Sequence, residues 1–207
     1  MRYTENARWV VVLRDRFYIK HKKVSAMEAE DFNKLPRKCQ EMFFQVLNCT
    51  RDYSVFDIVG FYNDFCESPI EQIFSMAFNI INFLYYNDIL RLDEQAEINT
   101  GKKTYRVDFL FDSQGEFSDF YTCQNNFKLV IECDGHEFHH ATKEQVKRDN
   151  ERQMNLKKAG YDIIRFSGTQ LYEDPWKCAE DAIEYILSNL GGIKNGGGID
   201  KFFKKDK

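Results

Sequence analysis

The clearest pattern in the chain is a run of apolar residues that recur every three or four positions between Ile70 and Leu84. That spacing places them on one face of a helix. Ser68, just before the run, is a favoured N-cap residue, and Pro69 suits the first helical turn. Glu71 stands where a capping box with Ser68 needs its acidic partner. The pattern therefore predicts a long amphipathic helix that starts at Pro69.

Three strand-like segments follow, at about residues 94–99, 104–111 and 127–133. They are rich in β-branched and aromatic residues, and the turn signal Thr100-Gly101-Lys102 joins the first two. Strands connected by short turns pair with opposite directions. These segments predict an antiparallel meander.

Helical and strand-like patterns then alternate towards the C-terminus. Thr142 and Gln145 are spaced as a capping box for a helix over 142–158, which feeds a compact strand over 161–166. A helical crossover implies that this strand pairs in parallel. A third helix is predicted over 174–190. The order helix, three strands, helix, strand, helix indicates an α/β fold with a central mixed β-sheet flanked by helices.

The 207 residues are enough for one domain with an appendage. We assign residues 1–62 to a small N-terminal α/β extension whose role the sequence does not reveal. Residues 63–190 form the main domain. Residues 191–207 are rich in Gly and Lys and are expected to be a flexible tail.

Composition narrows the class of protein. With 43% hydrophobic and 30% charged residues, the chain resembles a soluble globular protein. We find no run long enough to span a membrane and no secretory signal, so we expect a cytoplasmic protein that contacts no membrane, with free thiols at its six cysteines. The net charge of −4 argues against a broad basic surface for nucleic acid. An acidic site whose charge bound cations offset is compatible with that value.

Acidic residues stand within or at the ends of the two most apolar predicted strands. Asp108 lies inside the segment 104–111, and Glu132 and Asp134 end the segment 127–133. Because side chains alternate along a strand, Glu132 and Asp134 point to the same face. If the two strands are neighbours, Asp108 lies beside Glu132, and carboxylates are the ligands that Mg²⁺ prefers. Each acid alone could equally face water or cap a turn.

Four motifs extend this pattern: V-D-F at 107–109, I-E-C-D-G-H-E-F-H at 131–139, K-R-D-N-E-R at 147–152 and A-G-Y-D-I-I-R-F at 159–166. In order and spacing they resemble PD-(D/E)XK proteins related to the very-short-patch-repair endonuclease and the DUF559 family. The resemblance implies a restriction-endonuclease-like core in residues 63–190. It also implies an endonuclease that uses Mg²⁺ or Mn²⁺ to cleave nucleic acid, DNA rather than RNA, and it is compatible with a homodimer.

The resemblance also implies roles for individual acids. Asp108 and Glu132 match the acidic positions of the motif and would be catalytic metal ligands, with Asp134 and Glu71 as further acids of the same site. Glu71 has a second interpretation as the capping partner of Ser68. The superfamily has lysine two residues after the motif glutamate, whereas this chain has Asp134. A neighbouring cation would have to supply the missing charge.

Lys147 and Arg148 are the basic residues that we assign to that role, although both could simply be solvated surface charges. His139 is assigned to proton transfer or phosphate contact, because it follows the acidic strand on an expected loop. The spacing Cys133-x2-His136-x2-His139 also permits a zinc site, but it lacks a fourth ligand and Cys133 points away from the acids.

Arg165, near the end of the last predicted strand, and Gln170, just beyond it, could bind phosphate, or Arg165 could be an ordinary ion-pair partner. Two alternatives to an enzyme remain open. The first is a catalytically inactive nuclease-fold protein that binds nucleic acid or a protein partner, which the missing lysine favours. The second is a metal-binding regulatory module built on the histidines.

Overall fold

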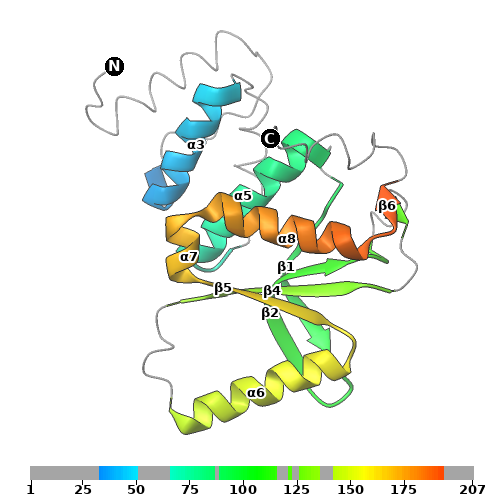
Figure 1. Ribbon diagram of the computed structural model, residues 1–207. Helices are drawn as coiled ribbons and strands as arrows, with labels where there is room; N and C mark the ends of the chain where they lie inside the picture. The colour runs from blue at the N-terminus through cyan, green and yellow to red at the C-terminus, as the bar shows by residue number, and fades with distance from the viewer. Residues whose placement is uncertain are drawn as a thin grey trace, which may run out of the picture.

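The computed structural model describes residues 33–50, 66–86, 89–115, 121–122, 126–135 and 142–193 (Figure 1). A four-stranded sheet runs through the middle, in the order β1-β2-β4-β5. Neighbouring strands are antiparallel except for β4 and β5, which are parallel. The strands of this sheet are β1 (Asp93–Asn99), β2 (Thr104–Asp112), β4 (Lys128–Asp134) and β5 (Asp162–Ser167).

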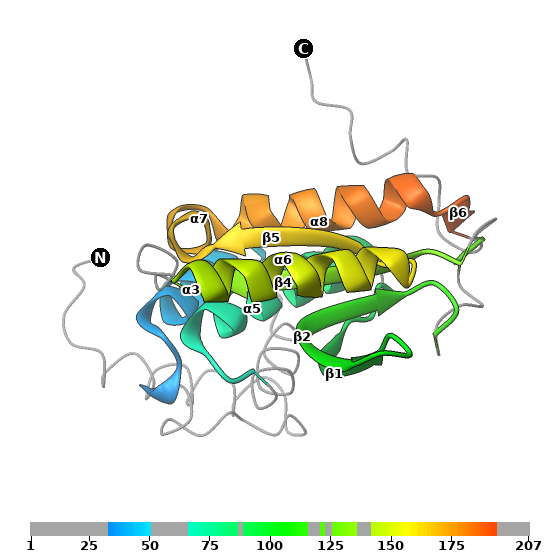
Figure 2. The ribbon, with the colours of Figure 1, turned by 90° about the horizontal axis from the view of Figure 1, so that it is seen from below.

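Helices cover both faces of the sheet. Figure 1 shows α5, α7 and α8 on one side and α6 on the other, and Figure 2 shows α6 lying across β4 and β5. The helices are α3 (Arg37–Thr50), α5 (Pro69–Tyr86), α6 (Lys143–Lys158), α7 (Gly168–Glu173) and α8 (Pro175–Asn189). The predicted α/β fold with a helix-flanked mixed sheet is confirmed.

Helix α5 is the centre of the larger core. The Ser68 hydroxyl accepts a hydrogen bond from the Glu71 backbone amide (3.4 Å) and donates to Glu71 Oε1 (2.6 Å), so Ser68 caps the helix as predicted, and the Glu67 amide donates to Glu71 Oε2 (2.8 Å). Most of the helix beyond this turn is buried, including Phe74 and Phe78 at 0% exposure. The helix packs between the sheet on one side and α3 and α8 on the other.

Helix α3 lies in the segment that we assigned to the N-terminal extension. Its Cys39, Met42 and Phe43 are buried in the same cluster as the core residues of α5 and α8. The Trp176 indole of α8 also donates to the Gln45 side chain of α3 (3.2 Å). This helix is therefore part of the main core. The strand-like run before it and residues 194–207 of the predicted tail lie outside the described residues.

The opposite face of the sheet has a smaller apolar cluster. Val130 of β4 and Leu156 of α6 are both fully buried there. Thr142 and Gln145 form the predicted capping box at the start of α6, and Gly160 (φ +89°) takes the left-handed conformation just after its end. The chain then enters β5 in parallel with β4, as predicted.

Three short elements were absent from the prediction. Helix α7 follows β5 directly, with Ser167 as its N-cap and Gln170 as its capping-box partner. Strands β3 (Tyr121–Thr122) and β6 (Gly192–Ile193) form a separate two-stranded sheet. Across the described residues, no helix combines the length and the apolar character that crossing a bilayer requires. The described cysteines Cys39, Cys66, Cys133 and Cys178 are free thiols, as expected.

Leu156 is the one buried residue of α6, which is described over its whole length. We therefore expect Leu156→Ala to destabilise the protein by about 2–4 kcal/mol through the loss of buried apolar surface and the cavity left behind. Amide hydrogen exchange in α6 should accelerate more than in α5. Met154→Ala on the same helix, 54% exposed, is the matched control and should change the unfolding free energy by less than about 0.5 kcal/mol. Urea denaturation of both variants measures the difference, and equal effects would contradict this account.

Candidate active site

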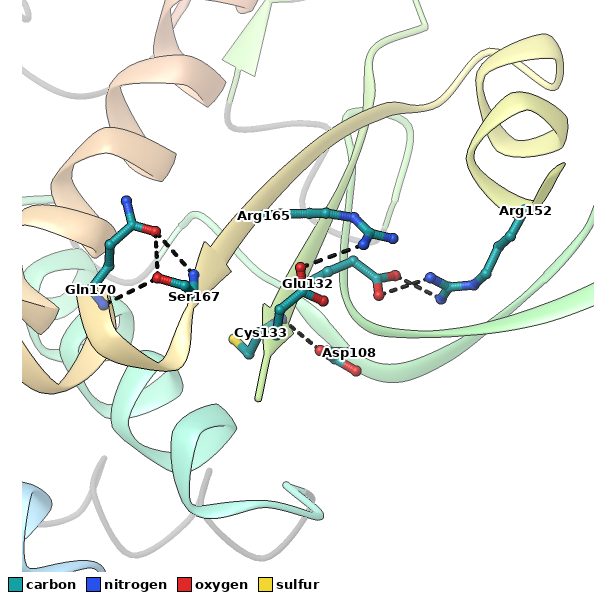
Figure 3. Close-up of polar contacts among 8 residues, drawn as sticks. Asp108, Glu132, Cys133, Arg152, Arg165, Ser167 and Gln170 are labelled. Atoms are coloured by element: carbon teal, nitrogen blue, oxygen red, sulfur yellow. Dashed lines mark hydrogen bonds and ion pairs between the residues drawn. The ribbon is translucent and has the colours of Figure 1, made fainter. Parts of the chain in front are cut away.

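The central acids meet where the antiparallel ladder between β2 and β4 ends. Its last pair joins Phe109 to Ile131, and the next residues outward are Asp108 and Glu132. Asp108 Oδ2 accepts a hydrogen bond from the Cys133 backbone amide at 2.7 Å (Figure 3). A side-chain oxygen of β2 thus binds the amide of β4 just beyond the last backbone pair. The sequence prediction that these two strands are neighbours is confirmed.

Glu132 is held by an arginine from the other layer. Its two carboxylate oxygens accept hydrogen bonds from Arg152 Nη1 (2.8 Å) and Nη2 (2.7 Å), a bidentate arrangement that is drawn in Figure 3. Arg152 Nη2 also donates to the Arg106 carbonyl (2.6 Å). Helix α6, strand β2 and strand β4 are therefore joined by one guanidinium group.

Asp134 has a different cation. Arg165 Nη1 of β5 lies 3.4 Å from Asp134 Oδ2. Arg165 follows Ile163 by two positions, and Ile163 packs in the small cluster with Leu156. Asp134 and Glu132 thus both contact arginines on the α6 side of the sheet, as the alternation along the strand predicted. Of the two roles considered for Arg165, the structure shows the ion pair.

Glu71, the fourth acid that the sequence analysis assigned, lies in the first turn of α5. Besides the two contacts at its own helix start, its Oε2 accepts a hydrogen bond from Gln95 Nε2 of β1 at 2.7 Å. The capping interpretation of Glu71 is therefore correct, but it does not describe all of its contacts. The negative charge of Glu71 is also one of the causes that raise the pKa of Asp108.

Burial and mutual repulsion alter the protonation of these acids. Burial, assisted by the charges of Glu132 and Glu71, raises the pKa of Asp108 to about 6, although the hydrogen bond from the Cys133 amide and the charge of Arg152 lower it. Burial also raises the pKa of Asp134, while Arg165 opposes the rise. For Glu94, burial is again the largest cause, and its pKa rises to about 7. The acidic side of the site is therefore costly to ionise without a nearby cation.

Arg152, which the sequence analysis did not assign to the site, is the cation that pairs with Glu132. Burial alone would lower its pKa, but the hydrogen bonds and charge of Glu132 outweigh burial and leave it raised. Lys147 and Arg148 are exposed, and Arg148 Nε donates to the Glu144 carbonyl of its own helix (3.4 Å). The sequence did contain a signal for Arg152. Arg152 lies four residues before the apolar Leu156, and residues four apart share a helix face, so this spacing directs Arg152 towards the sheet. His139, with the zinc spacing that includes it, lies outside the described residues.

The side chains of the site can be compared with the ligands that a divalent metal ion requires. Within the described residues, no three Asp, Glu, His or Cys side chains form a group ready to hold a metal. The chemistry of Asp108 and Glu132 nevertheless fits a hard cation, because both supply carboxylate oxygens and Glu132 raises the pKa of Asp108. The two are candidate ligands, and the remaining ligands are not fixed by the described residues.

One family model, REase_MTES_1575, matches residues 85–186, just under half of the chain. The match includes β1, β2, β4, α6 and β5, and hence Asp108, Glu132, Asp134 and Arg152, whereas Glu71 precedes it. It supports a restriction-endonuclease-like nuclease family, with which the four-stranded mixed sheet agrees. Comparisons with curated proteins and with solved structures found no match.

The raised pKa of Asp108 predicts how stability depends on pH. The folded state binds the proton more tightly than the unfolded state, so this contribution to stability is present below about pH 4 and is lost as the pH rises through about 6. Asn cannot ionise and can still accept from the Cys133 amide. In metal-free buffer, Asp108→Asn should therefore gain about 1 kcal/mol relative to the wild type between pH 4 and pH 7.5, a figure reduced for solvent screening.

Urea denaturation at both pH values, with a chelator present, measures this gain. Glu97→Gln is the matched control, because Glu97 is exposed on the adjacent strand and its replacement should leave the pH dependence unchanged. A difference between Asp108→Asn and wild type that is the same at both pH values would show that Asp108 ionises as an ordinary surface acid.

Proposed function

We propose, taking the restriction-endonuclease-like family of residues 85–186 as the premise, that this protein is a metal-dependent endonuclease that hydrolyses phosphodiester bonds of DNA. The family suggests nuclease activity. We further propose that the substrate is DNA, that the ion is Mg²⁺ or Mn²⁺, and that the protein belongs to the DUF559 and very-short-patch-repair branch. A cytoplasmic location, a homodimer and a nuclease domain at 63–190, whose core α3 completes, followed by a flexible tail, are part of the same proposal.

One observation carries the proposal. Asp108 and Glu132 lie on adjacent strands at the end of their shared ladder, and burial together with the negative charges of Glu132 and Glu71 holds the pKa of Asp108 well above its usual range. Such an arrangement lowers the free energy of unfolding at neutral pH, because the buried carboxyl must ionise beside other negative charges. A site that binds a cation gives a reason to keep it, since the ion offsets the repulsion.

Each residue then has a defined task. Asp108 and Glu132 would hold the ion, which when bound would lower the pKa of water and offset charge on the phosphate. The Cys133 amide fixes the Asp108 carboxylate through its hydrogen bond to Oδ2. Arg152 fixes the Glu132 carboxylate through both of its oxygens and would supply there the positive charge that the motif lysine, replaced by Asp134, does not.

The other assigned residues have supporting roles in this proposal. Asp134, paired with Arg165, adds negative charge on the α6 side of the sheet. Lys147 and Arg148 are exposed on α6 and would contact the phosphate backbone of the substrate. His139 remains assigned to proton transfer.

A second function is favoured by the same arginine. Because both oxygens of Glu132 accept from Arg152, the site could equally be a permanent ion pair in a protein that binds nucleic acid without cutting it. In that case Asp108 and Glu132 would be dispensable for binding. Cleavage and binding assays with the same variants separate the two functions.

Asp108→Asn and Glu132→Gln should each lower metal-dependent cleavage by at least about 100-fold, because each removes a charged ligand while keeping the shape of the side chain. Cleavage of plasmid, single-stranded DNA and RNA would be followed with Mg²⁺, Mn²⁺ or EDTA. Asp112→Asn is the matched control, since Asp112 is on the same strand but pairs with Lys128 at the far end of the ladder. Full activity in either site variant would refute the assignment.

Substitutions on α6 test which cation serves the site. Arg152→Lys should lower turnover about 10- to 100-fold, because lysine cannot make the bidentate contact with Glu132. Arg148→Ala and Lys147→Ala should lower turnover less and should mainly reduce the slope of log binding constant against log salt, by about 1 each. Turnover and salt-dependent DNA binding would be measured on all three. A larger loss of turnover in Arg148→Ala than in Arg152→Lys would reverse the assignment.

A further inference from the structure

Strand β1 contains an unusual backbone conformation in its middle. Gln95 has φ +52°, in the left-handed region that residues other than glycine seldom adopt, and it is the one such non-glycine residue in the described part of the chain. Its neighbours pair regularly with β2, Glu94 with Phe109 and Ala96 with Val107. In this register Gln95 lies opposite Asp108. Strain of this kind persists where the surroundings require it and is common at functional sites.

The conformation directs two consecutive side chains to the same helix. Consecutive residues of a regular strand point to opposite faces. Here the Glu94 carboxylate accepts a hydrogen bond from Ser75 (3.0 Å), and the Gln95 amide donates to Glu71 (2.7 Å), and both partners belong to α5. A left-handed residue at position 95 makes this arrangement possible.

The contact with Gln95 is not needed to cap α5. The Ser68 hydroxyl and the Glu67 amide already bind the Glu71 carboxylate within the first turn of the helix. Gln95 adds a third donor from the sheet, on the same oxygen that the Glu67 amide binds. It therefore restrains the carboxylate relative to β1, which pairs with β2, the strand that contains Asp108.

We propose that Gln95, which lies opposite Asp108 in the ladder, is a positioning residue whose amide orients the Glu71 carboxylate so that Glu71 contributes to binding the divalent ion. This role rests on the proposed metal dependence of the nuclease. Gln95 touches neither ion nor substrate in this scheme, and all of its effect passes through Glu71.

The test separates the backbone of Gln95 from its side chain. Gln95→Gly adopts the left-handed conformation without strain but has no amide. Mn²⁺ titration without nucleic acid gives the affinity of the ion, and cleavage assays at fixed Mn²⁺ give kcat and KM. Wild type, Gln95→Gly, Glu71→Gln and the double variant form a complete cycle. Glu97→Gly, at an exposed position of the same strand, controls for glycine in β1.

We expect Gln95→Gly to weaken Mn²⁺ binding about tenfold, the usual scale for losing a residue that orients a ligand. Its melting temperature should equal or exceed that of wild type, while kcat falls and the KM for DNA stays unchanged. In the Glu71→Gln background, the same substitution should alter Mn²⁺ affinity less than about twofold, because the carboxylate that Gln95 orients is no longer present. Should Gln95→Gly fail to fold, Gln95→Asn tolerates the backbone but is too short to reach Glu71.

Wild-type Mn²⁺ affinity in Gln95→Gly would overturn the proposal, and so would an equal loss in both backgrounds. Absence of Mn²⁺ binding by the wild-type protein would overturn it as well. Failure of the proposed nuclease has a separate signature: no cleavage of DNA or RNA by wild type, together with Mn²⁺ binding that still depends on Gln95 through Glu71. That result would leave the positioning role intact and remove only the reaction.

Discussion

The bidentate pair between Glu132 and Arg152 is the interaction on which the arrangement of the layers depends. Helix α6 contributes a single buried residue, Leu156, so apolar contact alone attaches it weakly. Arg152 adds three hydrogen bonds, two to β4 and one to the Arg106 carbonyl of β2. Removing one partner of a buried pair leaves the other charge without compensation, which commonly costs about 3–5 kcal/mol. The same contact thus attaches a helix and orients a candidate ligand.

The two sides of the site are organised by different chemistry. On the α6 side, Glu132 and Asp134 each have an arginine partner. Towards α5, Glu71 and Glu94 accept hydrogen bonds from neutral donors. Asp108 lies between these groups and has the Cys133 amide as its neutral donor. A cation would therefore find its uncompensated charge near Asp108 and Glu71 rather than near Asp134.

The sequence predicted an element correctly where the same residues determine both the local backbone conformation and burial in the core. The caps at Ser68 and Thr142 and the apolar strands gave the elements and the mixed sheet, because those patterns report both local conformation and burial. The acids on β2 and β4 could be paired for the same reason. Arg152 could not be distinguished from Lys147 and Arg148 by type, since only the docking of α6 decides which one reaches Glu132. The strain at Gln95 has no sequence signal, and α7 was missed because six residues are too few to show a period.

The kink at Gln95 has a further consequence, for the outer edge of the sheet. Among the described strands, β1 is the edge strand next to β2, and an edge offers its backbone amides and carbonyls to any approaching strand. A left-handed residue in the middle of that edge interrupts the regular row of donors and acceptors. A second extended chain could then add to only a short part of β1 before the register is lost. The residue that directs an amide towards Glu71 thus also shortens the stretch of this edge to which another strand can add.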